Sequence, residues 1–232
     1  MKKIAVYTCI TGDYDEVREP LVIEENCDYF IISDNPGMSK EPYHWIDVDS
    51  KVPDKGLSNK DKNRYCKLHP HLLFPEFDYS IYLDGSIQIK RPVGHNVTRV
   101  GKTGLALHKH RSGDCVYTEG IFLTWLGVVK KVEMIKEVSR FIEEGLPRHF
   151  GLRECSMIVT DLNNPRVPEI YGMWYEEYMK GSKRDQQALI SALWKMGLGV
   201  DDIGNLGGEF FLNNNPDIIW SVSEHYKKKI KS

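Results

Sequence analysis

The sequence has no closely spaced pair of cysteines, and this excludes several classes of small stabilised domain. Zinc knuckles and dithiol redox motifs need cysteines a few residues apart, and none are found. An odd number of cysteines also argues against the fully paired disulfide framework of a secreted protein. We therefore expect reduced thiols, in the cytoplasm, at Cys9, Cys27, Cys66, Cys115 and Cys155.

A long hydrophobic run and a strong net charge are also missing. The first apolar run ends at Thr11-Gly12-Asp13 after about seven residues, which is too short for a signal peptide or a membrane helix. The formal net charge of -2 does not point to nucleic acid as a partner. The basic C-terminal residues Lys227, Lys228 and Lys229 predict at most a weak peripheral membrane contact. Without repeats or linkers, we interpret residues 1–232 as a single domain.

Short apolar runs that end in acidic or turn residues are present in the N-terminal part of the chain. Ile4–Ile10 precedes a Thr-Gly-Asp turn, Tyr29–Ser33 precedes Asp34, and Trp45–Val48 is a further expected strand. Gly104–His108 and Ser156–Val159 predict later strands. This pattern favours an α/β fold with one mostly parallel central sheet, a polar rim and flanking helices.

The stretch SIYLDGSIQI, Ser80–Ile89, has two interpretations. Ile81–Leu83 is typical of a buried strand, and Asp84 would then project beyond its carboxyl end, where α/β sheets bind ligands. Asp-Gly is also a strong turn signal, so the same stretch fits a hairpin in which Asp84 only caps its own backbone. The decapeptide by itself does not decide between them.

A helix is predicted over Ser58–His69, with Ser58 as its N-cap in a capping box with Asp61. Its basic residues Lys60, Arg64 and Lys67 fall on one face. This stripe could bind a diphosphate, although a solvated basic face is the simpler interpretation. Likewise, the histidines of His108-Lys109-His110-Arg111 could be metal ligands but are more often a polar rim.

Three more helices are predicted in the second half of the chain. Val128–Gly145 is the clearest, with Glu137 expected to face solvent and an apolar stripe formed by Val128, Val132, Ile135, Ser139 and Ile142. Met173–Met179 is an aromatic-rich helix. A helix running from Ser182 to Met196 carries Asp185 near its start, where the residue could form a capping box with Ser182 or present its carboxylate to a ligand. The tail predicts a last helix, Pro216–Ile230.

Several segments, in consistent order, resemble the domain-of-unknown-function-616 (DUF616) family, whose plant members are regarded as glycosyltransferases. The resemblance covers about four fifths of the chain. It implies a GT-A fold, which is a Rossmann-like nucleotide-sugar domain. The segments that carry it are YTCITGDYDEVREP, DYFIISDN, RYCKLHPHLLFPEF, SIYLDGSIQI, ALHKHRSGDCVYTE and SKRDQQ.

The resemblance implies a role for particular residues of this chain. Asp84 would hold a divalent cation, Mn²⁺ or Mg²⁺, and Arg64 and Lys67 would face the diphosphate. Asp185 would be the base of an inverting mechanism or would sit beside the anomeric carbon in a retaining one. The remaining residues that it implies near nucleoside, donor sugar or acceptor are Tyr7, Thr8, Thr11, Asp34, His110, Arg111, Arg184 and Gln186.

The metal motif departs from the GT-A pattern, because Asp84-Gly85-Ser86 contains one carboxylate where two are usual. His225 is a further candidate ligand that no matched motif supports. The expected activity is transfer of a sugar from a nucleotide sugar, with uridine diphosphate as the expected carrier, to a carbohydrate or other hydroxyl in polysaccharide biosynthesis. Two alternatives stay open: a nucleotidyltransferase of similar fold, and a non-catalytic nucleotide- or carbohydrate-binding protein.

Overall fold

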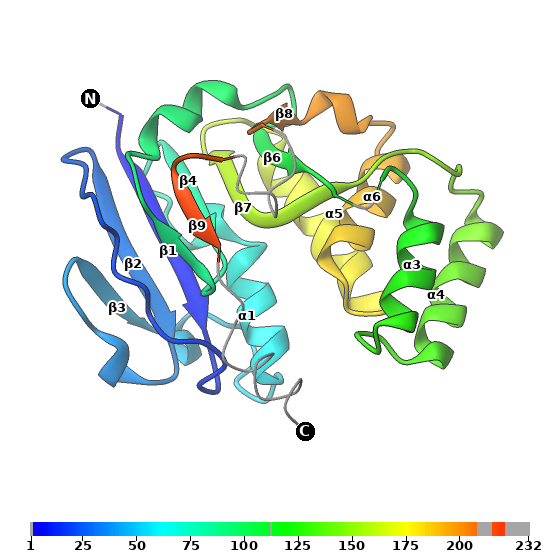
Figure 1. Cartoon of the computed structure of the whole chain (residues 1–232), viewed down its shortest axis with the longest axis horizontal. Helices are drawn as coiled ribbons and strands as arrows, with labels where there is room; N and C mark the ends of the chain where they lie inside the picture. Colours follow the sequence, from blue (N-terminus) through cyan, green and yellow to red (C-terminus); the bar gives the residue numbers. More distant parts are fainter. Residues whose placement is uncertain (1, 112, 208–214, 221–232) are drawn as a thin grey trace.

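A seven-stranded sheet in the order β3-β2-β1-β4-β7-β6-β8 runs through the molecule (Figure 1). The structure is a computed structural model that describes residues 2–111, 113–207 and 215–220. A two-stranded sheet pairs β5 with β9. The strands are β1 (Ile4–Ile10), β2 (Cys27–Ser33), β3 (Tyr43–Asp47), β4 (Tyr79–Leu83), β5 (Ile87–Ile89), β6 (Leu105–Lys109), β7 (Arg153–Asp161), β8 (Gly204–Asn205) and β9 (Ile218–Trp220).

The direction of the strands gives the sheet one edge where most carboxyl ends meet. Strands β3, β2, β1 and β4 are mutually parallel. Strand β7 is antiparallel to both β4 and β6, so β6 runs the same way as β4. The expected α/β fold with a mostly parallel central sheet is therefore confirmed.

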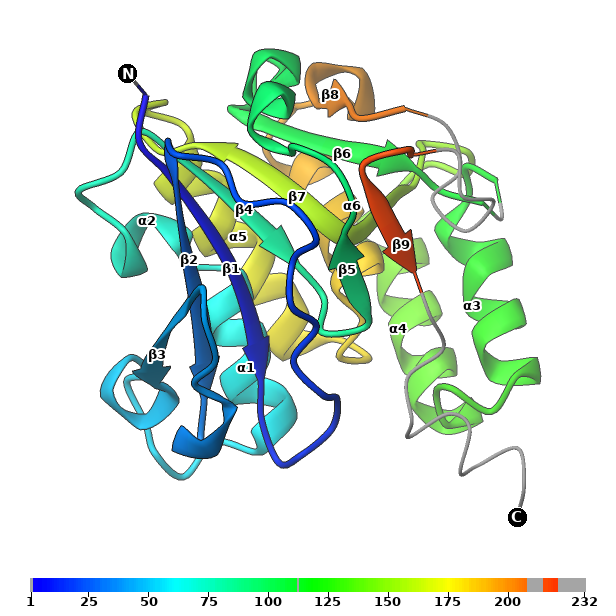
Figure 2. The same cartoon turned by 60° about the vertical axis from the view of Figure 1, so that its left-hand side comes forward.

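Helices cover one face of this sheet, and the β5–β9 ribbon covers part of the other (Figure 2). Alternation along β1 divides the core, since Tyr7 packs with the helices while Val6 packs with β5. Among the described residues, no helix is both long and apolar enough to cross a membrane. The α-helices are α1 (Asn59–Lys67), α2 (Pro70–Leu73), α3 (Val116–Trp125), α4 (Lys131–Glu144), α5 (Val167–Lys180) and α6 (Asp185–Lys195).

Two local predictions near the sheet edge are resolved by the structure. Helix α1 begins after Ser58, whose hydroxyl accepts from the Asp61 amide at 3.1 Å, so the predicted cap is confirmed. The hairpin interpretation of Ser80–Ile89 is wrong, because β4 lies in the central sheet and β5 pairs with β9 instead. A turn closed by the Ile87 amide and the Asp84 carbonyl at 2.9 Å carries the chain out of the sheet.

Two other predictions are wrong for tertiary reasons. The predicted apolar stripe of α4 is exposed, with Ile135 at 56%, whereas Glu137, which was expected to face solvent, is 4% exposed and lies on the inner face with Met134 and Phe141. The predicted helix Pro216–Ile230 is a strand at Ile218–Trp220, because this segment finds β5 as a hydrogen-bonding partner. The rest of that segment lies outside the described residues.

Candidate functional site

The carboxyl-terminal edge of the parallel strands gathers polar side chains from several elements. Thr11 follows β1, Asp34 follows β2, Asp84 follows β4, and His110 follows β6. Residues at the start of the antiparallel strand β7 lie at the same edge, because the Asp84 amide donates to the Ser156 carbonyl at 2.9 Å. In α/β proteins, this edge is where ligands bind.

Lys67, the last residue of α1, lies at the centre of this group. Its side chain is 1% exposed, and its Nζ lies 2.8 Å from Asp185 Oδ2 and 3.2 Å from Asp84 Oδ1. The same Nζ lies 4.8 Å from the ring centroid of Tyr82, whose hydroxyl donates to Asp84 Oδ1 at 2.8 Å. One ammonium group therefore connects acids that are far apart in the sequence.

Arg64 adds a second cation one helical turn earlier. Its Nε lies 3.4 Å from Asp185 Oδ2 but makes no hydrogen bond among the described residues. Asp185 opens helix α6, and the Trp174 indole donates to its carbonyl oxygen at 2.7 Å. The capping box predicted for Ser182 and Asp185 is not formed, because α6 has no side-chain cap and the Asp185 carboxylate faces Lys67 instead.

The charges of these groups stabilise one another. Burial tends to raise the pKa of Asp185, but Lys67, Arg64 and Arg184 outweigh it and hold this pKa well below its usual range. Burial likewise tends to lower the pKa of Lys67, but the carboxylates of Asp185 and Asp84 raise it. At neutral pH, the cluster therefore contains buried, fully charged cations and anions.

A second layer, based on Glu154 of β7, supports this cluster. Gln186 Nε2 donates to Glu154 Oε2 at 3.1 Å, the Ser156 hydroxyl donates to Glu154 Oε1 at 2.6 Å, and Arg184 Nη2 donates to Gln186 Oε1 at 2.9 Å. Burial raises the pKa of Glu154. Glu154 was not predicted as a site residue, since no local pattern in the sequence marks a buried acid within a strand.

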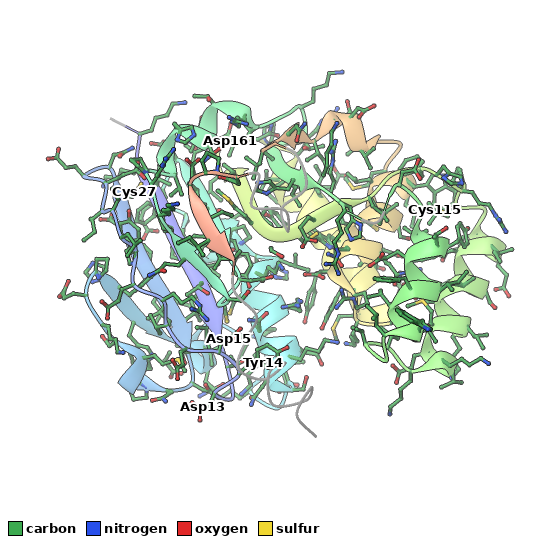
Figure 3. All side chains as sticks on the ribbon, viewed as in Figure 1. Asp13, Tyr14, Asp15, Cys27, Cys115 and Asp161 are labelled. Carbon is green, nitrogen blue, oxygen red and sulfur yellow. The ribbon has the colours of Figure 1, made fainter. Side chains whose placement is uncertain are left out.

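Asp15 is the nearest candidate for the carboxylate that the metal motif lacks. A Cβ at Gly85 would lie 3.0 Å from Asp15 Cβ, so the two turns pack together. Burial and the charge of Asp84 raise the pKa of Asp15 to about 6. Figure 3 places Asp15 at the lower end of β1, close to Asp13 and Tyr14.

The donor set for a cation is incomplete in the part of the chain that the structure describes. No group of three or more acidic, histidine or cysteine side chains is found there that could hold a metal ion. Asp84 already pairs with Lys67, and Asp15 adds one further carboxylate. Hard cations such as Mg²⁺ prefer about six oxygen ligands, so these residues do not form a cation site by themselves. His225 lies outside the described residues.

Some of the residues expected around the nucleoside lie at the carboxyl edge of the sheet, and others lie in the hydrophobic core. Asp34 accepts from the Gly12 amide at 3.0 Å, and Thr11 donates to the Asn59 carbonyl at 2.8 Å, so both are at the edge. Tyr7 lies in the core, where its hydroxyl contacts the Lys67 carbonyl at 3.2 Å. Thr8 faces the other side of the sheet, and its buried hydroxyl has no hydrogen-bond partner among the described residues.

His110 and Arg111 lie at the same edge but differ in burial. His110 is 8% exposed, and its Nε2 lies 3.7 Å from Glu119 Oε1 of α3. Burial lowers the pKa of His110, and the charges of Arg111 and Arg184 act in the same direction. Arg111 is exposed. His110 is therefore placed within electrostatic reach of the Arg184 segment.

Searches with the sequence alone find no relative: no protein-family model matches the chain, and no curated protein matches it. Membership of the DUF616 family therefore stays a prediction from the motifs. This result is consistent with the low identity to the solved structures described next.

The structure is similar to solved glycosyltransferases. It matches the apo structure of WbbM, a bifunctional glycosyltransferase, with a TM-score of 0.55 and 13% identity over 96% of this chain and 46% of that one. It also matches apo mouse xyloside xylosyltransferase 1, with a TM-score of 0.50 and 10% identity over 89% of this chain and 85% of that one. The chain thus spans about half the length of WbbM. At such low identity the likeness concerns the fold, and the chain has the α/β fold of these glycosyltransferases.

Proposed function

We propose that this protein transfers a sugar from a nucleotide-sugar donor to a hydroxyl of a carbohydrate acceptor. The observation that carries the proposal is the position of Lys67 between Asp84 and Asp185, at the carboxyl edge of a sheet whose fold is found in glycosyltransferases. That edge is where a nucleotide would bind in an α/β protein. A uridine diphosphate sugar is the donor class we propose.

Lys67 and Arg64 supply the chemistry that the leaving group needs. When the bond between the anomeric carbon and the donor oxygen breaks, negative charge develops on the diphosphate, and preorganised cations stabilise that charge. The pKa of Lys67 is raised by Asp185 and Asp84 against the effect of burial, so its ammonium is charged at neutral pH. The Arg64 side chain is 20% exposed, so its guanidinium could offer a charged donor to a phosphate oxygen.

Asp185 fits a positioning role better than that of a general base. A carboxylate whose pKa is held well below its usual range is a weak proton acceptor at neutral pH. Its contacts with Lys67 and Arg64 instead orient both cations. Arg184 and Gln186 would extend this arrangement toward the donor sugar, since the Gln186 amide is itself oriented by Glu154.

A divalent cation at Asp84 stays a prediction, and none of the steps above depends on it. Donor phosphates would have to supply several of its ligands, because Asp84 and Asp15 provide only part of a coordination sphere. Thermal unfolding with a nucleotide diphosphate, with and without Mn²⁺, measures whether the cation adds to nucleotide binding.

The test of the proposal is release of nucleoside diphosphate from a panel of nucleotide sugars, with and without oligosaccharide acceptors. We expect release from at least one donor, faster in the presence of an acceptor, and product mass increased by one sugar. Release of inorganic pyrophosphate from a nucleoside triphosphate would identify a nucleotidyltransferase instead. Saturable nucleotide binding without turnover on any donor would support the non-catalytic alternative.

A further inference from the structure

Large apolar side chains that are exposed to solvent gather on the α3–α4 hairpin. Trp125 is 77% exposed, which is unusual because tryptophan side chains are highly buried on average. A contiguous patch of this kind marks a binding surface more often than a lone exposed residue does. We call this surface the hairpin patch, and its members are 47% to 77% exposed: Ile121, Trp125, Leu126, Val132, Ile135 and Ile142.

Three members of the hairpin patch, Ile121, Trp125 and Ile135, line a groove between the two helices. The groove has a volume of about 480 Å³, and its walls include Ile121 and Trp125 from α3 and Met134 and Ile135 from α4. Helices α3 and α4 lie side by side at one end of the molecule, away from β1, β2 and β3 (Figures 1 and 2). This end can therefore approach a flat surface without hindrance from the first three strands.

The fold does not require the apolar outer face of α4, since this helix packs inward through other residues. Its inner face carries the apolar residues Met134 and Phe141, which are 4% and 0% exposed, beside the charged residue Glu137. An ordinary surface helix places its apolar residues inward and its charges outward. The outer apolar residues of α4 are more than half exposed and gain little from intramolecular packing, and an apolar binding partner would explain them.

Lysines at the start of α4 indicate that the partner of the hairpin patch carries negative charge. Lys130 is the N-cap of α4 and makes no side-chain capping hydrogen bond, and Lys131 is the first helical residue. Cations at a helix N-terminus are disfavoured by the helix dipole, so these lysines do not stabilise α4. Lys131 also lines the groove. Lys136 adds a third exposed cation. The acid Glu133 lies about 200° around the helix from Ile135, so it points away from the hairpin patch.

We propose that the hairpin patch docks on the surface of a membrane that contains anionic phospholipids. Trp125 would lie at the level of the headgroups, as aromatic side chains do at membrane interfaces. Ile121 and Ile135 would reach the acyl boundary, and Lys130 and Lys131 would contact lipid phosphates. The apolar area and the adjacent positive charge are the two features that interfacial binding requires.

A second copy of the chain fits the same surface less well. A two-fold dimer uses the same patch on both subunits, so its interface would enclose Lys130 and Lys131 of both copies. Like charges in an interface cost binding free energy. An anionic bilayer satisfies the apolar residues and the lysines together.

Flotation of the full chain with lipid vesicles tests the proposal. We expect binding to vesicles of phosphatidylcholine mixed equally with phosphatidylglycerol, and much weaker binding to phosphatidylcholine alone. The double substitution Trp125→Ser with Ile135→Ser should lower the partition coefficient by about tenfold or more. Lys130→Glu and Lys131→Glu should each lower it by at least about fivefold, and only on the anionic vesicles.

Matched controls separate this surface from other sources of binding. Leu72→Ser removes an apolar side chain that is 58% exposed on α2, outside the hairpin patch, and should leave vesicle binding unchanged. Replacing Lys227, Lys228 and Lys229 by alanine removes the basic C-terminal cluster and should also leave most of the binding. Thermal unfolding of each variant shows whether the fold is kept.

Three results would overturn the proposal. Equal binding of wild type to neutral and anionic vesicles would remove the role of the lysines, and loss of binding only in the C-terminal variant would move the contact to that segment. A dimer in light scattering that the Trp125→Ser, Ile135→Ser protein loses, together with no vesicle binding, would assign the hairpin patch to a second copy of the chain. None of these results bears on nucleotide-sugar turnover, so this inference and the proposed function can fail separately.

Discussion

Two clusters of charged residues in this protein differ in how far their carboxylates are open to solvent. In the scaffold cluster, Glu177 is fully buried and accepts hydrogen bonds from Arg140 at 2.6 Å, Ser191 at 2.7 Å and Lys195 at 2.9 Å. In the edge cluster, Lys67 is shared by two acids. Asp84 is 30% exposed there.

This difference shows how a structural ion cluster can be distinguished from a candidate binding site. The scaffold cluster connects α4, α5 and α6, and its carboxylate is saturated by its own chain. The edge cluster lies where strands end, and its Asp84 is 30% exposed. Among the described residues, an arginine Nε without a hydrogen-bond acceptor occurs in both clusters, at Arg64 and at Arg140. Burial and charge are common to both clusters, so neither property identifies function alone. Position at the sheet edge and a carboxylate that is open to solvent distinguish the edge cluster.

The largest expected effect is on activity. Asp84→Asn keeps the size of the side chain but removes the charge that orients Lys67 and would hold the predicted cation. We expect transfer to fall by about a thousandfold, which is typical when preorganised electrostatic stabilisation of the leaving group is lost. The fold should be retained, since Asp84 is partly exposed. Steady-state kinetics measures the rate of transfer, and circular dichroism measures whether the fold is retained. An unchanged turnover number in a folded variant would remove Asp84 from the mechanism.

The next effect concerns stability alone. Glu177→Ala removes the fully buried carboxylate that Arg140 and Lys195 share, and breaking such a cluster costs about 3 to 5 kcal/mol of unfolding free energy. Because Glu177 lies outside the edge cluster, nucleotide affinity at a temperature where the variant is folded should not change. Chemical denaturation and a nucleotide titration of the same sample provide the two readouts. A loss of nucleotide affinity would show that the two clusters are not independent.

A smaller effect is expected for Arg64→Ala. A charge-assisted hydrogen bond to a phosphate contributes about 1.5 to 3 kcal/mol, so the KM for the donor should rise by roughly tenfold or more. Substrate-dependence kinetics measures it, with Lys60→Ala, an exposed cation of the same helix, as the control. If the only consequence is a lower melting temperature, Arg64 belongs to the scaffold.

The smallest effect is a pH dependence at Asp15. Its pKa is raised from 3.8 to about 6 by burial and by Asp84, so the folded state binds its proton more tightly than the unfolded state does. The free energy of unfolding should therefore fall as the pH rises from 3.8 to about 6, and it should stay lower above that pH. Asp15→Asn should remove that decline and gain about 1 kcal/mol at neutral pH, after allowance for partial exposure. Denaturation at about pH 4 and pH 7 compares the two proteins. If the free energy of unfolding fell more steeply with rising pH in Asp15→Asn than in the wild type, this account would be contradicted.

The strands and helix that lead to the edge cluster could be predicted because their signals are local. Ile4–Ile10 is an apolar run ended by a turn, and Ser58 caps its own helix. The structure also brings Asp84 and Lys67 together, as the position of Asp84 after a buried strand indicated. In each case, neighbouring residues determine the local structure.

The remaining features depend on contacts between distant residues, which composition and periodicity do not contain. Asp185 faces Lys67, which lies 118 residues earlier, instead of capping its own helix. The strand Ile218–Trp220 needs β5 as its partner. Helix α4 turns Glu137 inward because Arg140 pairs with it at 3.2 Å and also reaches Glu177. Glu154 was missed because a buried acid within a strand has no local signature.

The central claim is that Lys67, held in place by Asp84 and Asp185, binds the diphosphate of a nucleotide sugar, and calorimetric titration with uridine diphosphate tests it most directly. We predict saturable binding to the wild type, at least about tenfold weaker binding to Lys67→Met, and partial recovery in Lys67→Arg, because the charge is then kept. Glu177→Gln, an equally buried change outside the edge cluster, should bind like the wild type. Wild-type affinity in a folded Lys67→Met protein would contradict the claim.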